Sequence, residues 1–173
     1  EQAGTEFTLA VRYPGWCHQM QVKVNGIPVS GAVKTDKGYW MIQRSWQPGD
    51  TVSCEMEMEP ERVYAHPMVR ADAGCVALRC GPIIYTFEGV DNGEDLQTLR
   101  IPREAKIEAL PYQADLLEGI VALRVTGCRK KTAVNPALYA EDAAPEEMVT
   151  LQAIPYYAWC NRGMTHMRVW MQE

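Results

Sequence analysis

Short stretches that alternate between apolar and polar residues constrain the fold of this chain most strongly. In the clearest one, from Thr51 to Met58, Val52, Cys54, Met56 and Met58 alternate with Thr51, Ser53, Glu55 and Glu57. Successive side chains of a β-strand point to opposite faces, so this pattern predicts a strand with one buried and one solvated face. No window has a persuasive helical period. The sequence therefore predicts an all-β protein.

Similar stretches follow one another along the chain and are separated by turn residues, a spacing typical of β-sandwiches. Asn25-Gly26 predicts a two-residue hairpin because both positions accept positive φ. The return strand, Ile27-Pro28-Val29, is expected at a sheet edge because proline cannot donate a ladder hydrogen bond. The predicted strands are 6–13, 20–24, 27–29, 37–42, 51–58, 63–69, 75–80, 83–88, 106–110, 120–125, 148–154 and 166–171.

The character of the chain changes at Gly89. From there to Pro102 it is polar, with Asp91-Asn-Gly-Glu-Asp95 at the centre, and this stretch is interpreted as a linker. Weaker strands follow, together with an acidic loop at 141–147 whose charges repel and stay solvated. This change indicates two modules on either side of Gly89.

Composition excludes several classes of protein. The 173 residues are 47% hydrophobic, enough for an adequate core, and the formal net charge of −5 with no basic stripe argues against a nucleic-acid surface. No apolar run is long enough for a membrane span, and no signal-peptide pattern opens the chain. The start at Glu1 without methionine indicates a piece of a longer protein, although processing or tag removal would give the same start.

The six cysteines form no Cys-x-x-Cys pair and lie at no zinc-finger spacing from histidine. Cys54 and Cys80 fall on the predicted apolar faces of strands, where a thiol behaves as a small hydrophobe. This usage predicts reduced structural cysteines, with no disulfide and no metal site. It favours a reducing compartment, and therefore a cytoplasmic over an extracytoplasmic location.

Two groups of residues invite a catalytic interpretation, and neither is favoured. Glu88, Asp91, Glu94 and Asp95 could supply a carboxylate pair for glycoside hydrolysis. Their neighbours are charged and turn-forming, so burial is not expected to raise a carboxyl pKa there. Cys17 and His18 are sequence neighbours that point to opposite faces of an extended segment, so they cannot pair directly. The prediction is that this chain holds no catalytic residue.

Aromatic residues are the most informative group for function. Near the C-terminus, Pro155 precedes Tyr156, Tyr157 and Trp159, and the following Asn161-Arg162-Gly163 is a predicted turn. On a β-sandwich such side chains can stack sugar rings, or they can form an interface with another domain, where Trp, Tyr and Arg are enriched. The interface is favoured. The candidate interface or sugar-stacking residues are Arg44, Trp46, Tyr156, Tyr157, Trp159 and Arg162.

Several motifs, in this order, resemble the C-terminal part of glycoside hydrolase family 127, the β-L-arabinofuranosidase family. They are Tyr13-Pro-Gly-Trp-Cys17, Val24-Asn-Gly26, Gly38-Tyr-Trp-Met-Ile-Gln-Arg-Ser-Trp-Gln-Pro-Gly-Asp50, Gly81-Pro-Ile-Ile-Tyr85 and Pro155-Tyr-Tyr-Ala-Trp-Cys-Asn-Arg-Gly163. The resemblance covers almost the whole chain and is weakest between Gly89 and Glu147.

This resemblance implies an upstream (α/α)6 barrel that carries a cysteine nucleophile, a zinc site and a glutamate acid/base. It also implies two β-sandwich (jelly-roll or immunoglobulin-like) modules, the second inserted in the first, with the C-terminal strand returning to the first sheet. On this basis the first module is 1–88 plus 160–173 and the second is 89–159. The chain is expected to be an inactive tail that supports the barrel, with a possible homodimer and plant arabinose-containing glycans as partners. Cys17 and Cys160 lie in the sandwich motifs, so neither is expected to be the nucleophile.

Two rival interpretations remain open. The chain could be a free-standing carbohydrate-binding module that uses exposed Trp and Tyr side chains. It could also be an adhesin-like sandwich with no link to sugar, which would require a non-aromatic solvent-facing surface. The aromatic content argues against this last interpretation.

Overall fold

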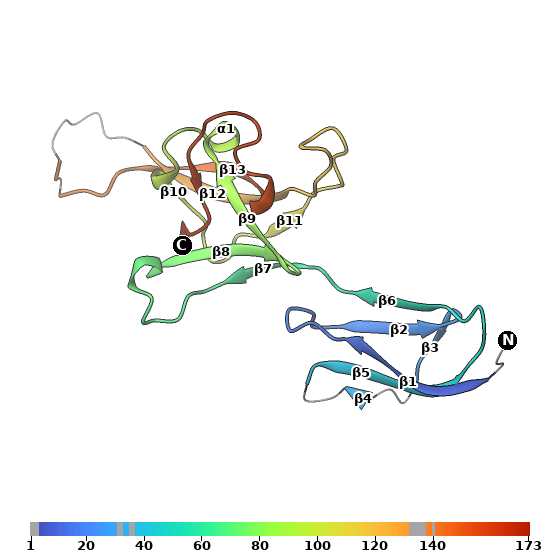
Figure 1. Cartoon of the computed structure of the whole chain (residues 1–173). Coiled ribbons are helices and arrows are strands. Elements are labelled where there is room, and N and C mark those ends of the chain that lie inside the picture. The colour runs from blue at the N-terminus through green and yellow to red at the C-terminus, as the bar shows by residue number, and fades with distance from the viewer. Residues whose placement is uncertain (1–3, 31–32, 35–36, 132–137, 140) are drawn as a thin grey trace. The chain divides into compact units, whose positions relative to one another are not determined.

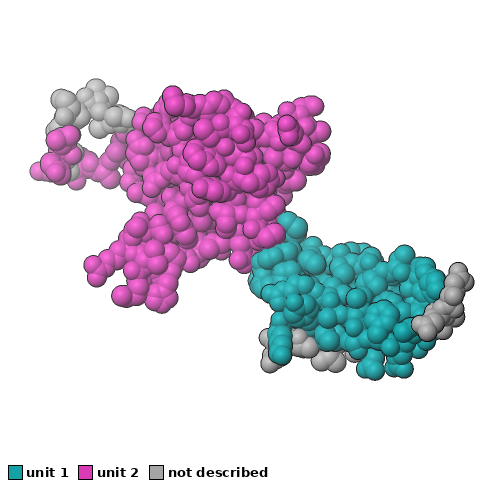
Figure 2. Space-filling model, in the orientation of Figure 1, with its two compact units in different colours: residues 1–58 teal, residues 59–173 magenta. Residues whose placement is uncertain are grey.

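A computed structural model of the chain describes residues 4–30, 33–34, 37–131, 138–139 and 141–173 (Figure 1). The chain divides into two compact units (Figure 2), residues 1–58 and residues 59–173. Strands dominate both units, so the predicted all-β class is confirmed. No helix among the described residues is long and apolar enough to cross a membrane.

Unit 1 contains two small antiparallel sheets with a shared core. One is formed by β1 (Thr5–Arg12), β5 (Tyr39–Trp46) and β4 (Val33–Lys34), and the other by β3 (Ile27–Pro28), β2 (Met20–Val24) and β6 (Val52–Met56). The predicted hairpin is confirmed, since Asn25 and Gly26 have φ values of 52° and 78° and connect β2 to the edge strand β3. The buried residues of the core are Tyr13, Cys17, Met20, Val22, Val24, Ile42 and Trp46.

Unit 2 is organised around a sheet that closes on itself. Its nine strands follow the order β14-β9-β13-β12-β10-β15-β8-β7, with β11 beside β12, and an additional pairing of β9 with β8 completes a ring. The strands are β7 (Pro60–Val63), β8 (Cys75–Cys80), β9 (Ile83–Glu88), β10 (Leu99–Arg100), β11 (Ile107–Ala109), β12 (Leu123–Lys130), β13 (Glu146–Pro155), β14 (Met167–Arg168) and β15 (Met171–Gln172). The short helical turns are η1 (Arg70–Asp72), α1 (Gly89–Asn92), η2 (Leu96–Thr98) and η3 (Tyr156–Ala158).

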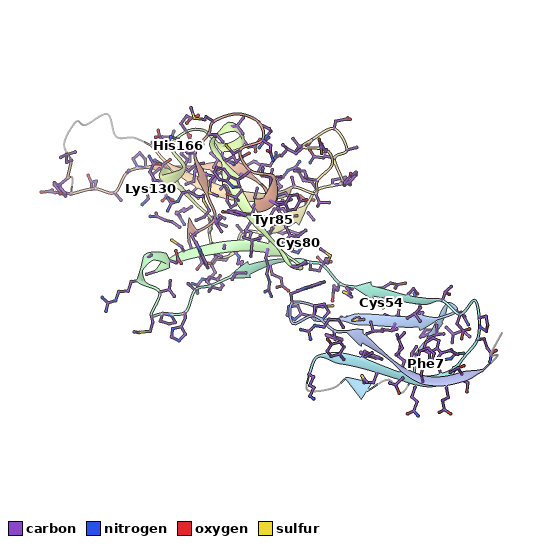
Figure 3. The ribbon with its side chains drawn as sticks, in the orientation of Figure 1. Phe7, Cys54, Cys80, Tyr85, Lys130 and His166 are labelled. Atoms are coloured by element: carbon purple, nitrogen blue, oxygen red, sulfur yellow. The ribbon has the colours of Figure 1, made fainter. Side chains whose placement is uncertain are left out.

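The main core of unit 2 takes apolar side chains from every strand of this ring. Alternation along each strand directs one set of residues into the core, as in Leu123 and Val125 of β12 or Leu151 and Ala153 of β13. Tyr85 is also buried there, and its hydroxyl donates a hydrogen bond to the carbonyl of Val121 at 2.8 Å. The labelled side chains of Cys80 and Tyr85 can be followed in Figure 3. The remaining buried members are Val76, Leu78, Cys80, Phe87, Leu96, Leu99, Ile101 and Met171.

The division between the units differs from the predicted boundary at Gly89. β8 and β9 precede Gly89 in sequence, yet they pair with β13, β14 and β15, so they belong to unit 2. The stretch 89–102 is also more than a linker, because it forms α1, η2 and β10 and buries Leu96 and Leu99. Sequence alternation identifies strands but does not say which distant strand is the neighbour.

Two expectations about individual strands are wrong. The strand expected at 63–69 lies earlier, as β7 (Pro60–Val63), and Met68 and Val69 belong to an exposed turn. On β6, Cys54 is exposed although its ladder partner Val22 is buried, while Val52 and Met56 pack partly against the core. In contrast, Cys80 is buried as expected, and burial raises the pKa of its thiol.

Candidate functional site

The aromatic segment Tyr156–Trp159 leaves the sheet directly after β13. Pro155 is the last residue of that strand, and the chain then forms the single turn η3. Ala158 is the buried member of the turn and packs with Ile120, Ala122 and Ile154. The turn is therefore anchored through its smallest side chain, and this leaves the three aromatic side chains at the surface.

The three aromatic side chains present a substantial exposed area. The exposed fractions are 45% for Tyr156, 67% for Tyr157 and 36% for Trp159. The rings of Tyr156 and Trp159 lie 6.5 Å apart and are tilted by 37°. A tilted pair does not form one flat platform for a sugar ring, whereas exposed aromatics grouped in this way are typical of an interaction surface.

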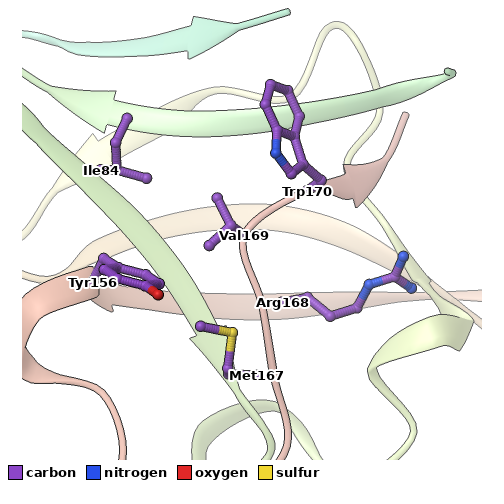
Figure 4. Close-up of a pocket in the computed structure, with 6 residues that line it drawn as sticks. All are labelled: Ile84, Tyr156, Met167, Arg168, Val169 and Trp170. Carbon is purple, nitrogen blue, oxygen red and sulfur yellow. The ribbon is translucent and has the colours of Figure 1, made fainter. Parts of the chain in front are cut away.

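An apolar groove adjoins this segment (Figure 4). Its volume is about 580 Å³, and Met167, Val169 and Trp170 of the C-terminal segment line one part of it. Ile84 of β9 lines another part, and Tyr156 connects the groove to the aromatic segment. β14 is held beside β9 by ladder pairing and by the Thr86 hydroxyl, which donates to the Arg168 carbonyl at 3.0 Å. We call the groove together with Tyr157 and Trp159 the aromatic surface.

Arg162 follows the aromatic segment in the chain and donates hydrogen bonds to two carboxylates that lie far away in the sequence. Its Nη1 and Nη2 atoms donate to the two oxygens of Asp91 at 2.9 and 2.5 Å, and Nη2 also donates to Glu88 Oε2 at 2.6 Å. These hydrogen bonds, first to Asp91 and then to Glu88, raise the pKa of Arg162 further above its ordinary value. The arginine therefore stays charged, and a planar guanidinium matches this geometry better than a lysine could. We call Glu88, Asp91 and Arg162 the Arg162 cluster.

Glu88 is buried, although its charged and turn-forming neighbours in the sequence gave no reason to expect burial. Its exposed fraction is 1%, and its second oxygen, Oε1, accepts a hydrogen bond from the backbone N–H of Cys160 at 2.7 Å. A buried carboxylate requires such compensation, and the charge needed comes from Arg162, which is 74 positions away in sequence. Glu94, by contrast, is an exposed residue, so the four carboxylates do not form one site.

Asn92 is a buried residue whose structural role the sequence does not predict. Its side-chain amide donates to the carbonyls of Glu88 and Gln152 at 2.9 and 2.8 Å, and its Oδ1 accepts from the Gln152 N–H at 2.9 Å. These bonds attach α1 to β13 and thereby fix Asp91 relative to the strand that precedes the aromatic segment. Asp91-Asn-Gly was interpreted as a turn signal, and Gly93 does have a positive φ of 84°. The attachment of α1 to β13 by the Asn92 side chain cannot be predicted from the neighbouring sequence.

Arg44 and Trp46 lie in unit 1, whereas the other four candidate residues belong to unit 2. Trp46 belongs to the core, with its ring 5.4 Å from that of Phe7 and its Nε1 donating to the Phe7 carbonyl at 3.0 Å. The guanidinium carbon of Arg44 lies 5.2 Å from the centroid of the Trp46 ring, and its Nη2 is 3.6 Å from Asp50. Trp46 is thus a packed side chain rather than an exposed stacking platform.

Nucleophilic or metal chemistry finds little support in the described residues. All six cysteines are free, and Cys17 is buried with its thiol directed to the Gln19 carbonyl at 3.0 Å. His18 is exposed. In the part of the chain that the structure describes, no group of three or more His, Cys, Asp or Glu residues could hold a metal ion.

Comparison with known families decides the relationship of this chain. Residues 60–172 match the glycoside hydrolase family 127 C-terminal domain, and residues 1–58 match the GH127 β-L-arabinofuranosidase middle domain. The chain belongs to glycoside hydrolase family 127. The resemblance inferred from the motifs is thereby confirmed, and the two matched regions meet where the structure divides.

Relatives in family 127 are much longer than this chain. A non-reducing end β-L-arabinofuranosidase of Bifidobacterium longum subsp. longum is 34% identical, over 94% of this chain but 25% of the relative. A crystal structure of a GH127 β-L-arabinofuranosidase from Geobacillus stearothermophilus T6 is 46% identical with a TM-score of 0.92, over 99% of this chain and 27% of that one. A further GH127 β-arabinofuranosidase structure is 31% identical with a TM-score of 0.82, over 99% and 28%. The chain thus spans about a quarter of the relatives' length.

Proposed function

We propose that this chain is a non-catalytic β portion of a family 127 glycoside hydrolase and that it supports a separate catalytic domain. The observation that carries the proposal is the match of nearly the whole chain to the middle and C-terminal domains of that family. The zinc site, cysteine nucleophile and acid/base glutamate implied by the resemblance would then lie outside this chain.

The aromatic surface of unit 2 is the proposed contact with that domain. Interfaces are enriched in Tyr, Trp and Arg, and large aromatic side chains contribute most when a partner removes them from water. Tyr157, at 67% exposed, has the most area to lose. Arg44 and Trp46 of unit 1 are retained only as candidates for a second contact, which would use the exposed part of the Arg44 side chain. A homodimer contact is an alternative use of either surface.

For the whole protein we propose hydrolysis of a terminal β-L-arabinofuranoside with retention of configuration. The printed activities of the Bifidobacterium and Geobacillus relatives support this substrate class. Plant-derived glycans that contain arabinose are the proposed source of substrate. Fold alone does not fix a substrate, so the assignment rests on these relatives.

Two finer points of architecture are also proposals. The contribution of both sheets of unit 1 to one core supports a β-sandwich assignment for that unit. Insertion of residues 89–159 into a module that contains β8 and β9, which lie in unit 2, would require the chain to return to these strands after the insertion. The pairing of β14 with β9 and of β15 with β8 supports such a return.

A chimeric enzyme tests the supporting role. This chain replaces the corresponding region of the Geobacillus relative, and arabinofuranosidase activity and the melting temperature are measured. The chimera is expected to be active, and Trp159→Ala or Tyr157→Ala to lower its melting temperature. Tyr139→Ala is the matched control, because Tyr139 is 92% exposed and lies outside the strands and helical turns. Equal effects of Tyr157→Ala and Tyr139→Ala would contradict the proposed contact.

The carbohydrate-binding alternative is tested on the isolated chain. Titration calorimetry with arabinose-containing oligosaccharides is expected to give no saturable heat. Saturable heat that disappears with Trp159→Ala would favour a binding module, because stacked aromatics supply much of the contact area with sugar rings. That result would overturn a purely structural role for the exposed aromatic segment.

A further inference from the structure

The Arg162 cluster joins the aromatic segment to the beginning of α1. Glu88 ends β9, Asp91 lies in α1, and Arg162 lies in the turn that follows Trp159. Both oxygens of each carboxylate accept a hydrogen bond, from Arg162 or from the Cys160 N–H. No ladder pairing of the sheet includes residues 156–163. The cluster is therefore the main polar connection between this segment and the rest of unit 2.

The backbone of the segment needs such a connection. Cys160 has a φ of 64°, a left-handed conformation that is unfavourable for a residue with a side chain. The N–H of this same residue donates to the buried Glu88. Within the segment, the hydrogen bond from the Trp159 N–H to the Tyr156 carbonyl is long, at 3.3 Å. Of the three side chains of η3, the small Ala158 is the buried one, so the apolar anchor of this turn is small.

We propose that the Arg162 cluster is a clasp that sets the conformation of residues 156–163 independently of the β-sheet, with Arg162 as the positioning residue. When the clasp is intact, Tyr156, Tyr157 and Trp159 are held as one preformed surface. When it is broken, this segment opens as a local unit while the ring of strands stays folded. This extends the proposed function, because a preformed surface binds a partner without paying the entropy of ordering it.

Chemistry favours an arginine in this position. A guanidinium can donate to two carboxylates at the same time, whereas the single ammonium of lysine cannot reproduce the paired bonds to Asp91. Loss of those bonds weakens the hold on Arg162, so the buried negative charge of Glu88 is less well compensated. A conformation in which water reaches the Glu88 carboxylate is then favoured. Opening the 160–163 turn is the nearest route, since Asn161 and Gly163 are already exposed.

Hydrogen–deuterium exchange of the isolated chain tests the clasp. In Arg162→Lys, the amides of 156–163 are expected to exchange at least about tenfold faster than in the unaltered chain. The amides of β12 and β13 are expected to keep their rates. Arg100→Lys is the matched control, since Arg100 makes comparable paired bonds to Glu146 at 2.9 and 2.6 Å on the surface, away from the segment. It is expected to leave 156–163 unchanged.

Two results would overturn the proposal. One is unchanged exchange in 156–163, and the other is equal acceleration of 156–163, β12 and β13, which would make the cluster part of the global fold. If Arg162→Lys does not fold, Asp91→Asn provides the same test, because it preserves the Glu88–Arg162 pair and removes one carboxylate charge. The exchange experiment needs no partner, so the clasp and the proposed contact with a catalytic domain can fail independently.

Discussion

The two units use the same strand chemistry but bury their apolar side chains to different extents, as the chain's two phenylalanines show. Phe87 in unit 2 has an exposed fraction of 0%, whereas Phe7 in unit 1 is 48% exposed although it stacks on Trp46. Phe87 lies on β9, within a sheet that closes into a ring. Phe7 lies on β1, at the edge of a three-stranded sheet. The closed sheet of unit 2 therefore buries Phe87 more completely than the edge strand β1 buries Phe7.

Replacement of each phenylalanine gives the largest test of this comparison. Phe87→Ala is expected to lower the free energy of unfolding by about 3–5 kcal/mol, because it leaves a cavity in a closed core. Phe7→Ala is expected to cost about 1 kcal/mol, from lost stacking and partial burial. Urea unfolding followed by circular dichroism and tryptophan fluorescence measures both. Similar losses in the two variants would contradict the difference between the cores.

Substitution of one glycine in each unit by alanine tests how tightly the surrounding atoms are packed. A Cβ added to Gly127 of β12 would lie 2.3 Å from Leu151 Cδ1 and 2.9 Å from the Arg100 carbonyl oxygen. Leu151 is buried, so Gly127→Ala is expected to cost about 1–3 kcal/mol in urea unfolding. Gly15 of unit 1 has no atom within 4 Å of its added Cβ, so Gly15→Ala should change stability by less than about 0.5 kcal/mol. A tolerated Gly127→Ala would show that the Leu151 side chain and the Arg100 carbonyl can move to make room for the added methyl group.

A tyrosine in each unit tests whether hydrogen bonds also differ. Tyr85→Phe removes the bond to the Val121 carbonyl, and Tyr13→Phe removes a bond of 2.9 Å to the His18 carbonyl. Each is expected to cost about 1 kcal/mol at neutral pH. Comparable losses in urea unfolding would show that packing, not hydrogen bonding, distinguishes the units. A much larger loss for Tyr85→Phe would extend the difference to polar groups.

The Tyr85 variant also has a predicted pH dependence. Burial raises the pKa of Tyr85 from its ordinary value of 10.0 to about 12. The folded-state pKa is the higher one, so the stabilisation is complete below pH 10.0 and is lost as the pH rises toward about 12. The stability difference between the unaltered chain and Tyr85→Phe should therefore shrink in urea unfolding above pH 10.0. A difference that stays constant would contradict the burial effect.

A small effect on stability at acidic pH is expected from Glu173, which follows β15. Glu173 accepts a hydrogen bond from the Tyr64 hydroxyl at 2.6 Å, and this bond, with help from Arg103, holds the pKa of Glu173 below its ordinary 4.5. The folded-state pKa is the lower one, so this stabilisation is present above pH 4.5 and is lost as the pH falls below it. Glu173→Gln should cost about 1 kcal/mol or less near neutral pH. In urea unfolding, the cost should disappear in acid, and a cost that persists there would point to packing instead.

The sequence by itself determined the all-β class, most strand positions, the Asn25-Gly26 hairpin and the family. These depend on local properties: the alternation of apolar residues, turn residues that accept positive φ, and motifs that are read along the chain. The exposed aromatic segment was also found in this way, because Tyr156, Tyr157 and Trp159 are close in sequence. Its position after a strand that ends at a proline needed no tertiary information.

The tertiary structure alone decided the closure of β8 onto β9 and the burial of Glu88 beside Arg162. Each of these depends on contacts between residues far apart in sequence, for which no single-sequence pattern exists. The charged stretch around Asp91 resembled a solvated linker because its compensating cation lies 71 positions away. Electrostatic compensation depends on distance in space rather than in sequence, and only folding brings the Arg162 guanidinium to the carboxylates of Glu88 and Asp91.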